Sequence, residues 1–324
     1  MGTPYTRRCL LQASAVTVTG FGGIASASPS ESESDAPEEE DYEQIPPLDL
    51  SDVDLQLESV DADGVPEQAD GIRPGSQMFI EREGGTAGCT ANFIWRDASN
   101  PDGPLYIGAA GHCFLEDAPA SESDARDHED GDDVSDLSIS VCADCTFGGT
   151  TGLTVIEGEV IELGDVVYAR QSNPNEDDDG GVGHDFGLVA IPEEMEEVID
   201  PSLPQFGGPD GVSPEAVPEG ELVNQYGAGI VVGEAFPTQG STGVSLGDGG
   251  SPESWFSAIE AAPGDSGSPL LEGLDGGEEG GAAAGVLTHL STNGTAGTTM
   301  QRCKEMPADD GTGFDIEIVQ PGEL

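Results

Sequence analysis

Basic side chains are almost absent from this sequence. Only nine of its 324 residues are Lys or Arg, against 64 Asp and Glu, and the formal net charge is −55. Proteins that bind nucleic acid need Lys and Arg to neutralise phosphates, so this class is excluded. Acidic residues spread along a whole chain are typical of a protein that works in molar salt, where a Debye length of about 3 Å screens self-repulsion. A mesophilic protein with acidic loops is the alternative.

Long apolar runs are lacking as well, and none beyond the N-terminus is long enough to span a membrane. Residues 1–27 combine Arg7-Arg8, a weakly apolar stretch and the small-residue end Ala25-Ser26-Ala27. This pattern predicts a twin-arginine (Tat) signal peptide and a secreted, extracellular product. A membrane anchor is the alternative, but the run is short and rich in Gly, Ser and Thr. After removal of the signal, no stable membrane insertion is expected.

Residues 28–70 contain many acidic side chains and no basic one. High charge combined with few aromatic residues argues against a packed core. We therefore predict an acidic disordered linker here, or a pro-segment that is removed on activation. The folded domain is expected to cover residues 71–324.

Cysteines are few, and one of the six, Cys9, lies in the signal peptide. The other five are an odd number, which leaves one unpaired. Cys142 and Cys145 form a Cys-x-x-Cys motif, but no second pair or histidine cluster completes a zinc site. We predict a local disulfide between them and a free Cys303, which could instead pair with either one. No cofactor and no metal is indicated.

From residue 72 onward, short runs rich in β-branched and aromatic residues are broken by Gly, Pro, Asn and Asp. This pattern predicts an all-β fold. In the first half, strands are expected at residues 78–81, 90–95, 105–109, 153–163, 166–170 and 186–191. In the second half, they are expected at residues 222–226, 229–232, 255–259, 267–271, 284–289 and 314–319.

One serine stands between glycines, in the stretch Gly264-Asp265-Ser266-Gly267. Glycine permits backbone geometries that other residues resist, so a serine in such a turn can expose its hydroxyl. Serine is a poor nucleophile alone and requires a histidine base and an orienting carboxylate. Ala110-Gly111-His112-Cys113 contains a histidine upstream, and Asp185-Phe186-Gly187-Leu188 contains an acid. The order His, Asp, Ser differs from that of subtilisins and of α/β-hydrolases.

Together these three segments resemble the signature segments of the trypsin/chymotrypsin-like serine proteases, and most closely the secreted bacterial branch that includes streptogrisins. The resemblance implies two packed antiparallel six-stranded β-barrels, over about residues 72–191 and 219–320, with the active site in the cleft between them. It implies His112, Asp185 and Ser266 as the catalytic triad.

The resemblance also assigns roles to neighbouring groups. The backbone N–H groups of Gly264 and Ser266 would form the oxyanion hole. A disulfide between Cys89 and Cys113 would staple the turn that carries the histidine. Asp265 would be a buried carboxylate that needs a positive partner, and Arg96, Arg170 or an amine created near Ile72 are the candidates.

Substrate specificity is left open by conflicting signals. In the family, the residue six positions before the nucleophile forms the base of the primary specificity pocket, and here this residue is Glu260. A carboxylate there would select substrates with Arg or Lys before the cleaved bond. That Glu260 is an ordinary surface carboxylate is an equal alternative. The segment Thr288-His289-Leu290 would form a wall of the pocket that pairs with substrate. The presence of His289 favours substrates with acidic side chains. Leu290, which stands where the family usually has a glycine, would narrow the pocket.

The sequence thus predicts a monomeric, secreted endopeptidase that acts on polypeptides through an acyl-enzyme. A noncatalytic extracellular or cell-surface binding protein on the same fold is the alternative. An esterase with the same triad is a third hypothesis.

Overall fold

A computed structural model describes residues 42–67, 69, 71–115, 137–150, 153–171, 182–230, 237–273 and 280–324. The predicted signal peptide lies outside these residues. Within them, no helix has the length and apolar character needed to cross a lipid bilayer.

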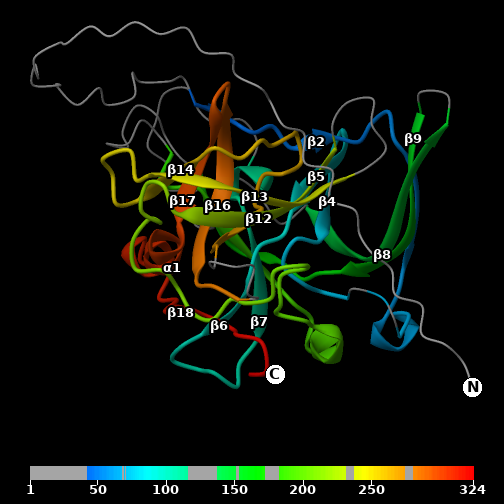
Figure 1. Ribbon diagram of the computed structural model, residues 1–324. Coiled ribbons are helices and arrows are strands. Elements are labelled where there is room, and N and C mark those ends of the chain that lie inside the picture. Colours follow the sequence, from blue (N-terminus) through cyan, green and yellow to red (C-terminus); the bar gives the residue numbers. More distant parts are fainter. Residues whose placement is uncertain are drawn as a thin grey trace, which may run out of the picture. The chain divides into compact units, whose positions relative to one another are not determined.

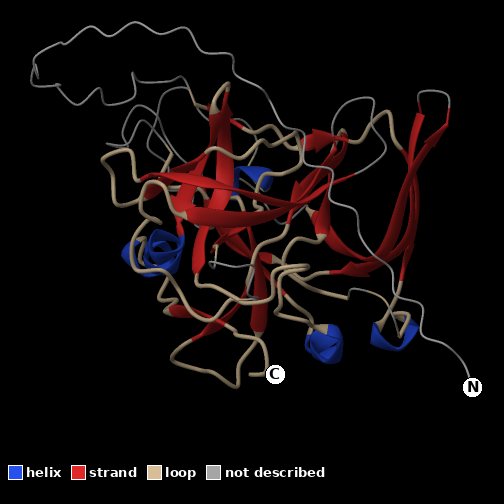
Figure 2. Cartoon of the chain, in the orientation of Figure 1, coloured by secondary structure: helices blue, strands red, loops and turns tan. Residues whose placement is uncertain are grey.

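Strands dominate the described part of the chain, as Figure 2 shows and as the all-β prediction required. The C-terminal half forms a closed antiparallel barrel of six strands, in the order β16-β15-β12-β13-β14-β17, because β16 also pairs with β17 (Figure 1). Its strands are β12 (Leu222–Ile230), β13 (Pro237–Gly247), β14 (Ser254–Ser257), β15 (Pro269–Glu272), β16 (Ala283–Ser291) and β17 (Gly294–Thr299).

The N-terminal half contains two sheets. One has the order β2-β5-β4-β8-β9-β3, in which β2 is Leu48–Asp49 and β3 is Asp54–Ser59. The other has the order β10-β11-β7-β6-β18, and its strand β18 is added from residues 316–318. The elements that first appear here are β4 (Gln77–Arg82), β5 (Gly85–Thr90), β6 (Ile94–Asp97), β7 (Leu105–Ala109), β8 (Ser138–Thr150), β9 (Leu153–Glu162), β10 (Val166–Arg170), β11 (Phe186–Ala190) and β18 (Ile316–Ile318).

Strands β7 and β11 are almost wholly buried because both of their faces pack against apolar side chains. Ile107 and Val189 face one core cluster, whereas Tyr106 and Leu188 face another. Their sequences are therefore apolar at successive positions instead of alternating, which is the pattern of a strand covered on both sides. These two adjacent strands carry the histidine and aspartate segments at their ends.

In the part of the chain that the structure describes, the helical elements are short. They are the 3-10 turns η1 (Ala62–Gly64), η2 (Gly111–Cys113) and η4 (Glu193–Val198) and the helix α1 (Met300–Asp309). Helix α1, which was not expected from the sequence, follows the Thr299 N-cap and buries Cys303. Burial raises the pKa of the Cys303 thiol well above its ordinary value.

The expectation of a disordered linker does not hold for residues 42–67. Three strands form there: β1 (Glu43–Gln44) pairs with β16, β2 (Leu48–Asp49) with β5, and β3 (Asp54–Ser59) runs parallel to β9. Acidic and apolar residues alternate in this stretch, so the carboxylates remain in water while Ile45, Leu48 and Leu50 are buried. The folded unit thus begins before the predicted boundary at residue 71.

Candidate active site

Ser266 lies in the tight turn before β15, between Gly264 with φ of +92° and Gly267 with φ of +93°. Residues other than glycine rarely adopt such φ values. At Gly267 a Cβ atom would also stand only 2.1 Å from the Thr90 carbonyl oxygen. The turn therefore requires glycine at both positions, and it holds Ser266 fully buried.

His112 belongs to η2, the 3-10 turn that directly follows β7. Asp185 directly precedes β11, which pairs antiparallel with β7. An antiparallel pair brings the end of one strand beside the start of the other, so the two side chains meet although 73 positions separate them. His112 Nδ1 lies 2.6 Å from Asp185 Oδ2, and the His112 backbone N–H donates to Asp185 Oδ1 at 3.1 Å.

The other ring nitrogen, His112 Nε2, lies 2.9 Å from Ser266 Oγ. The structure therefore brings together the three side chains that the sequence analysis singled out, two from the N-terminal half and one from the barrel. His112 is 5% exposed and Asp185 is fully buried. Burial favours a neutral Asp185 carboxyl, but His112 outweighs it through its charge and hydrogen bonds, so the pKa of Asp185 lies below its ordinary value.

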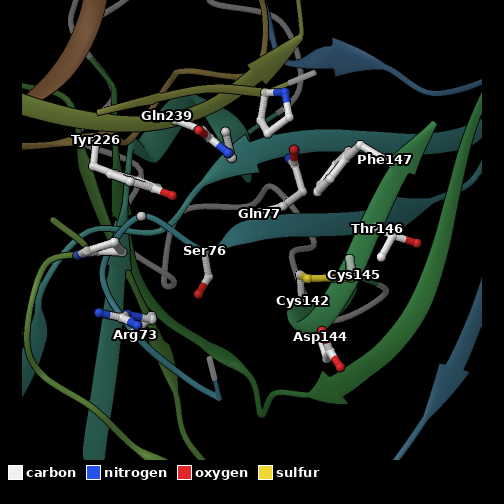
Figure 3. A pocket seen from close by; sticks show the side chains of 15 residues that line it. Arg73, Ser76, Gln77, Cys142, Asp144, Cys145, Thr146, Phe147, Tyr226 and Gln239 are labelled. Carbon is white, nitrogen blue, oxygen red and sulfur yellow. A yellow bond between two sulfur atoms is a disulfide. The ribbon is translucent and has the colours of Figure 1, made fainter. Parts of the chain in front are cut away.

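Both predicted disulfides are present. Cys89 in β5 is bonded to Cys113 in η2, which fastens the histidine turn to the neighbouring sheet. Cys142 and Cys145 are bonded within β8, and Cys303 is free and buried. The second disulfide lies at the edge of a pocket of about 360 Å³. Figure 3 shows this disulfide among the side chains that line the pocket. Among the described residues, no group of three or more His, Cys, Asp or Glu could hold a metal ion.

Removal of the Cys89–Cys113 bond is expected to lower the free energy of unfolding. A double Cys89→Ala, Cys113→Ala variant should lose about 3 kcal/mol, because the bond closes a loop of 24 positions in the unfolded chain. Denaturant unfolding in molar salt measures this loss. The Cys142→Ala, Cys145→Ala pair is the control, since its bond spans only 3 positions and should contribute less. Equal losses would contradict the loop-closure account.

Asp265 is fully buried and is held by uncharged donors. Its carboxylate accepts hydrogen bonds from the backbone N–H groups of Gly229 and Ala262, both at 2.8 Å, and from Thr238 Oγ1 at 2.6 Å. Burial outweighs these bonds and raises the pKa of Asp265 above its ordinary value.

The positive partner that the resemblance implied for Asp265 is not among the described contacts. Arg96 instead pairs with Glu317 at 2.7 Å, and Arg170 pairs with Asp310 at 3.1 Å. Ile72 is an internal residue whose N–H donates to a backbone carbonyl, so it offers no amine here.

The predicted pocket residues fall into two groups. Thr288, His289 and Leu290 lie on β16, and the charge of His289 contributes to lowering the pKa of Asp185. Glu260, in contrast, is exposed to solvent, while the preceding Ile259 is buried in an apolar cluster. The structure therefore does not bring the Glu260 carboxylate to the floor of an enclosed pocket.

Residues 44–46, which were not expected at the site from the sequence, lie against the triad. Gln44 Nε2 donates to Asp185 Oδ2 at 2.9 Å, and Ser266 Oγ donates to the Ile45 carbonyl oxygen at 2.7 Å. The predicted oxyanion-hole N–H of Gly264 donates to the Pro46 carbonyl oxygen at 3.3 Å. The apolar stretch Ile45-Pro46-Pro47-Leu48 within acidic surroundings was the available signal.

No protein-family model matches this chain, and no curated protein matches its sequence. Among solved structures, the thermostable serine protease AL20 from an extremophilic microorganism shares 15% identity, covers 74% of this chain and 96% of its own, and has a TM-score of 0.43. The protease Anisep from Arthrobacter nicotinovorans shares 13% identity, with coverages of 72% and 94% and a TM-score of 0.43. Protease A of Thermobifida fusca shares 18% identity, with coverages of 77% and 98% and a TM-score of 0.41. Each of these three likenesses is to a protease and is distant, with identities of 13–18% and TM-scores of 0.41–0.43.

Proposed function

We propose that this chain is a secreted serine endopeptidase, exported by the Tat route and adapted to high salt. The observation that carries the proposal is the continuous line of hydrogen-bonding atoms from the Asp185 carboxylate through the His112 imidazole to the Ser266 hydroxyl. A nucleophile, a base and an orienting acid within this reach are what acyl transfer requires. The two disulfides fit an oxidising compartment.

In the proposed mechanism, Ser266 Oγ attacks the carbonyl carbon of a peptide bond while His112 Nε2 takes its proton. The carbon–nitrogen bond then breaks, and His112 delivers that proton to the leaving amine. Water, activated by His112, hydrolyses the remaining ester on Ser266. Asp185 holds the imidazole in the required tautomer and stabilises its charged form.

The negative charge that develops on the carbonyl oxygen of the substrate must be stabilised by hydrogen-bond donors. The backbone N–H groups of Gly264 and Ser266 are the candidates, because both belong to the glycine turn that presents the nucleophile. Each donor of this kind contributes about 3 kcal/mol of transition-state stabilisation in comparable sites.

A fluorophosphonate, which reacts with activated serines, is expected to label Ser266 in molar salt. Because residues 44–46 lie over Ser266, the wild type is compared with an Ile45→Asp variant that loosens this cover. In the Ile45→Asp background, Ser266→Ala should abolish the label, whereas Ser268→Ala, which removes a neighbouring buried hydroxyl, should retain it. Mass spectrometry locates the label, and circular dichroism confirms folding.

Failure of labelling in every folded variant would refute the protease proposal and favour a noncatalytic extracellular binding protein. Labelling together with turnover of esters but not of peptides would favour the esterase hypothesis. Both results are independent of whether residues 44–46 slow the reaction of the wild type.

A further inference from the structure

Residues 43–46, which we name the covering segment, add a strand to the edge of β16. Gln44 lies opposite His289 in an antiparallel register, and the Ile45 N–H donates to the Thr288 carbonyl oxygen at 2.9 Å. Addition of an extended peptide to a sheet edge is a common way for proteins to bind peptides. The covering segment therefore occupies the position at the edge of β16 where a substrate strand would pair.

The covering segment contacts all three side chains of the proposed triad. The Ile45 carbonyl oxygen accepts from Ser266 Oγ at 2.7 Å and lies 2.9 Å from His112 Nε2. The Gln44 amide donates to Asp185 at 2.9 Å. These contacts leave Ser266 with no exposed surface, so a second peptide cannot reach it while the segment is in place.

The orientation of the Ile45–Pro46 peptide bond opposes its own cleavage. For attack, the carbonyl carbon must face Ser266 Oγ, and the carbonyl oxygen must face the oxyanion donors. Here the Ile45 oxygen itself faces the Ser266 hydroxyl and accepts its hydrogen, while the Gly264 N–H is engaged by the next carbonyl, that of Pro46. The segment therefore blocks the site without being a substrate in this pose.

The side chain of Ile45 indicates what the neighbouring pocket accepts. It is fully buried in an apolar cluster that includes Ile259 and Leu287, and the partly buried Leu290 packs against the same cluster. Glu260 points its charge to solvent and is exposed. A branched aliphatic side chain fits this setting, whereas a charged one would be desolvated without a partner.

The rest of the N-terminal part holds the covering segment in place. Leu48 and Leu50 are buried beside Phe79 and Ile156, and β3 pairs with β9 along six residues. A segment tethered to the rest of the folded chain acts at a high effective concentration, so even modest contacts keep it bound.

We infer that the covering segment is a built-in inhibitor and that Ile45 marks the primary specificity of the site. The chain is held inactive until this segment is displaced, and its substrates are extended polypeptides with an aliphatic residue before the cleaved bond. The inference rests on the proposed function, because it assigns the regulation and the substrate class of the same site.

The rate of fluorophosphonate labelling tests the inhibitory role in the full-length protein. Ile45→Asp should accelerate labelling of Ser266 by about 100-fold, because a carboxylate cannot replace a buried aliphatic side chain. Ile45→Ala should give a smaller increase in the labelling rate, and it replaces Ile45→Asp as the test variant if Ile45→Asp does not fold. The matched control is Val244→Asp, which adds the same charge at an exposed position of β13 and should label at the wild-type rate.

A wild type that labels as fast as Ile45→Asp would overturn the inhibitory role while leaving the protease proposal intact. The absence of Ser266 label in all folded variants would overturn the protease proposal itself. The two failures are therefore distinguishable.

A synthetic peptide of residues 42–50 tests the same contact in trans. It should inhibit the Ile45→Asp variant competitively, whereas the same peptide with Asp in place of Ile45 should not. Peptide libraries assayed with the Ile45→Asp variant should show the fastest cleavage after Ile, Val or Leu. Preferred cleavage after Arg, Lys or Glu would refute the specificity assigned to this pocket.

Discussion

Replacement of His112 by alanine is expected to lower kcat for peptide hydrolysis by about 10⁶-fold, the loss seen when the base of a comparable triad is removed. The imidazole is the one group within hydrogen-bonding distance of both Ser266 Oγ and Asp185 among the described contacts. Without it, Ser266 has no base and the leaving amine has no acid. Because His112 does not hold the peptide strand, KM should change little.

This measurement uses the Ile45→Asp background, in which the covering segment is loosened. His184→Gln is the control histidine variant, since His184 pairs with Glu253 at 3.1 Å and not with Ser266. Its kcat should stay near that of the parent. A His112→Ala variant that keeps more than one-hundredth of the parent kcat would contradict the assigned mechanism.

Replacement of Asp185 by asparagine is expected to lower kcat by about 10⁴-fold while preserving the fold. Asparagine can turn its amide toward His112 Nδ1, so the imidazole is held in the wrong tautomer and the positive charge that it gains is no longer stabilised. Steady-state kinetics in the Ile45→Asp background measures the loss, and the secondary structure by circular dichroism should match that of the parent.

The same substitution should change how stability depends on pH. The pKa of Asp185 in the folded protein lies below its ordinary value, mainly because the charge and hydrogen bonds of His112 outweigh burial. Ionised Asp185 therefore contributes stability that is present above the unfolded-state pKa and is lost as the pH falls through the folded-state pKa. Unfolding free energies measured at descending pH should fall more steeply for the parent than for Asp185→Asn. Parallel curves would contradict this assignment.

The covering segment lies within the strongly acidic stretch of residues 28–70. Residues 28–70 are so acidic that composition alone favours disorder, yet from residue 42 the chain joins three sheet edges. Edge pairing requires backbone groups and a few buried apolar side chains, and it tolerates carboxylates on the outer face. A high average charge therefore does not exclude strands where apolar residues recur at the right spacing.

The sequence by itself determined the all-β class and the order of the three candidate catalytic segments, and it favoured a local Cys142–Cys145 disulfide. The Cys89–Cys113 pair was implied only by the resemblance to the protease family. The strand pattern, the glycine turn and the Cys-x-x-Cys motif each depend on residue types at short spacing. Gly264 and Gly267 are demanded by a local turn, and Cys113 follows directly after His112. Local chemistry of this kind can be read without knowing which distant segments meet.

The residues that contact the candidate site from remote parts of the chain are set by the tertiary structure alone. Ile45 is separated from Ser266 by 221 positions, and nothing local to either residue predicts their contact. The same holds for Asp265, whose neutral donors come from Gly229 and Thr238, and for the exposure of Glu260. These contacts and exposures depend on how the barrel packs against the N-terminal strands. A carboxylate or an isoleucine has no fixed environment until that packing exists, so its burial and its partners are not encoded in the neighbouring sequence.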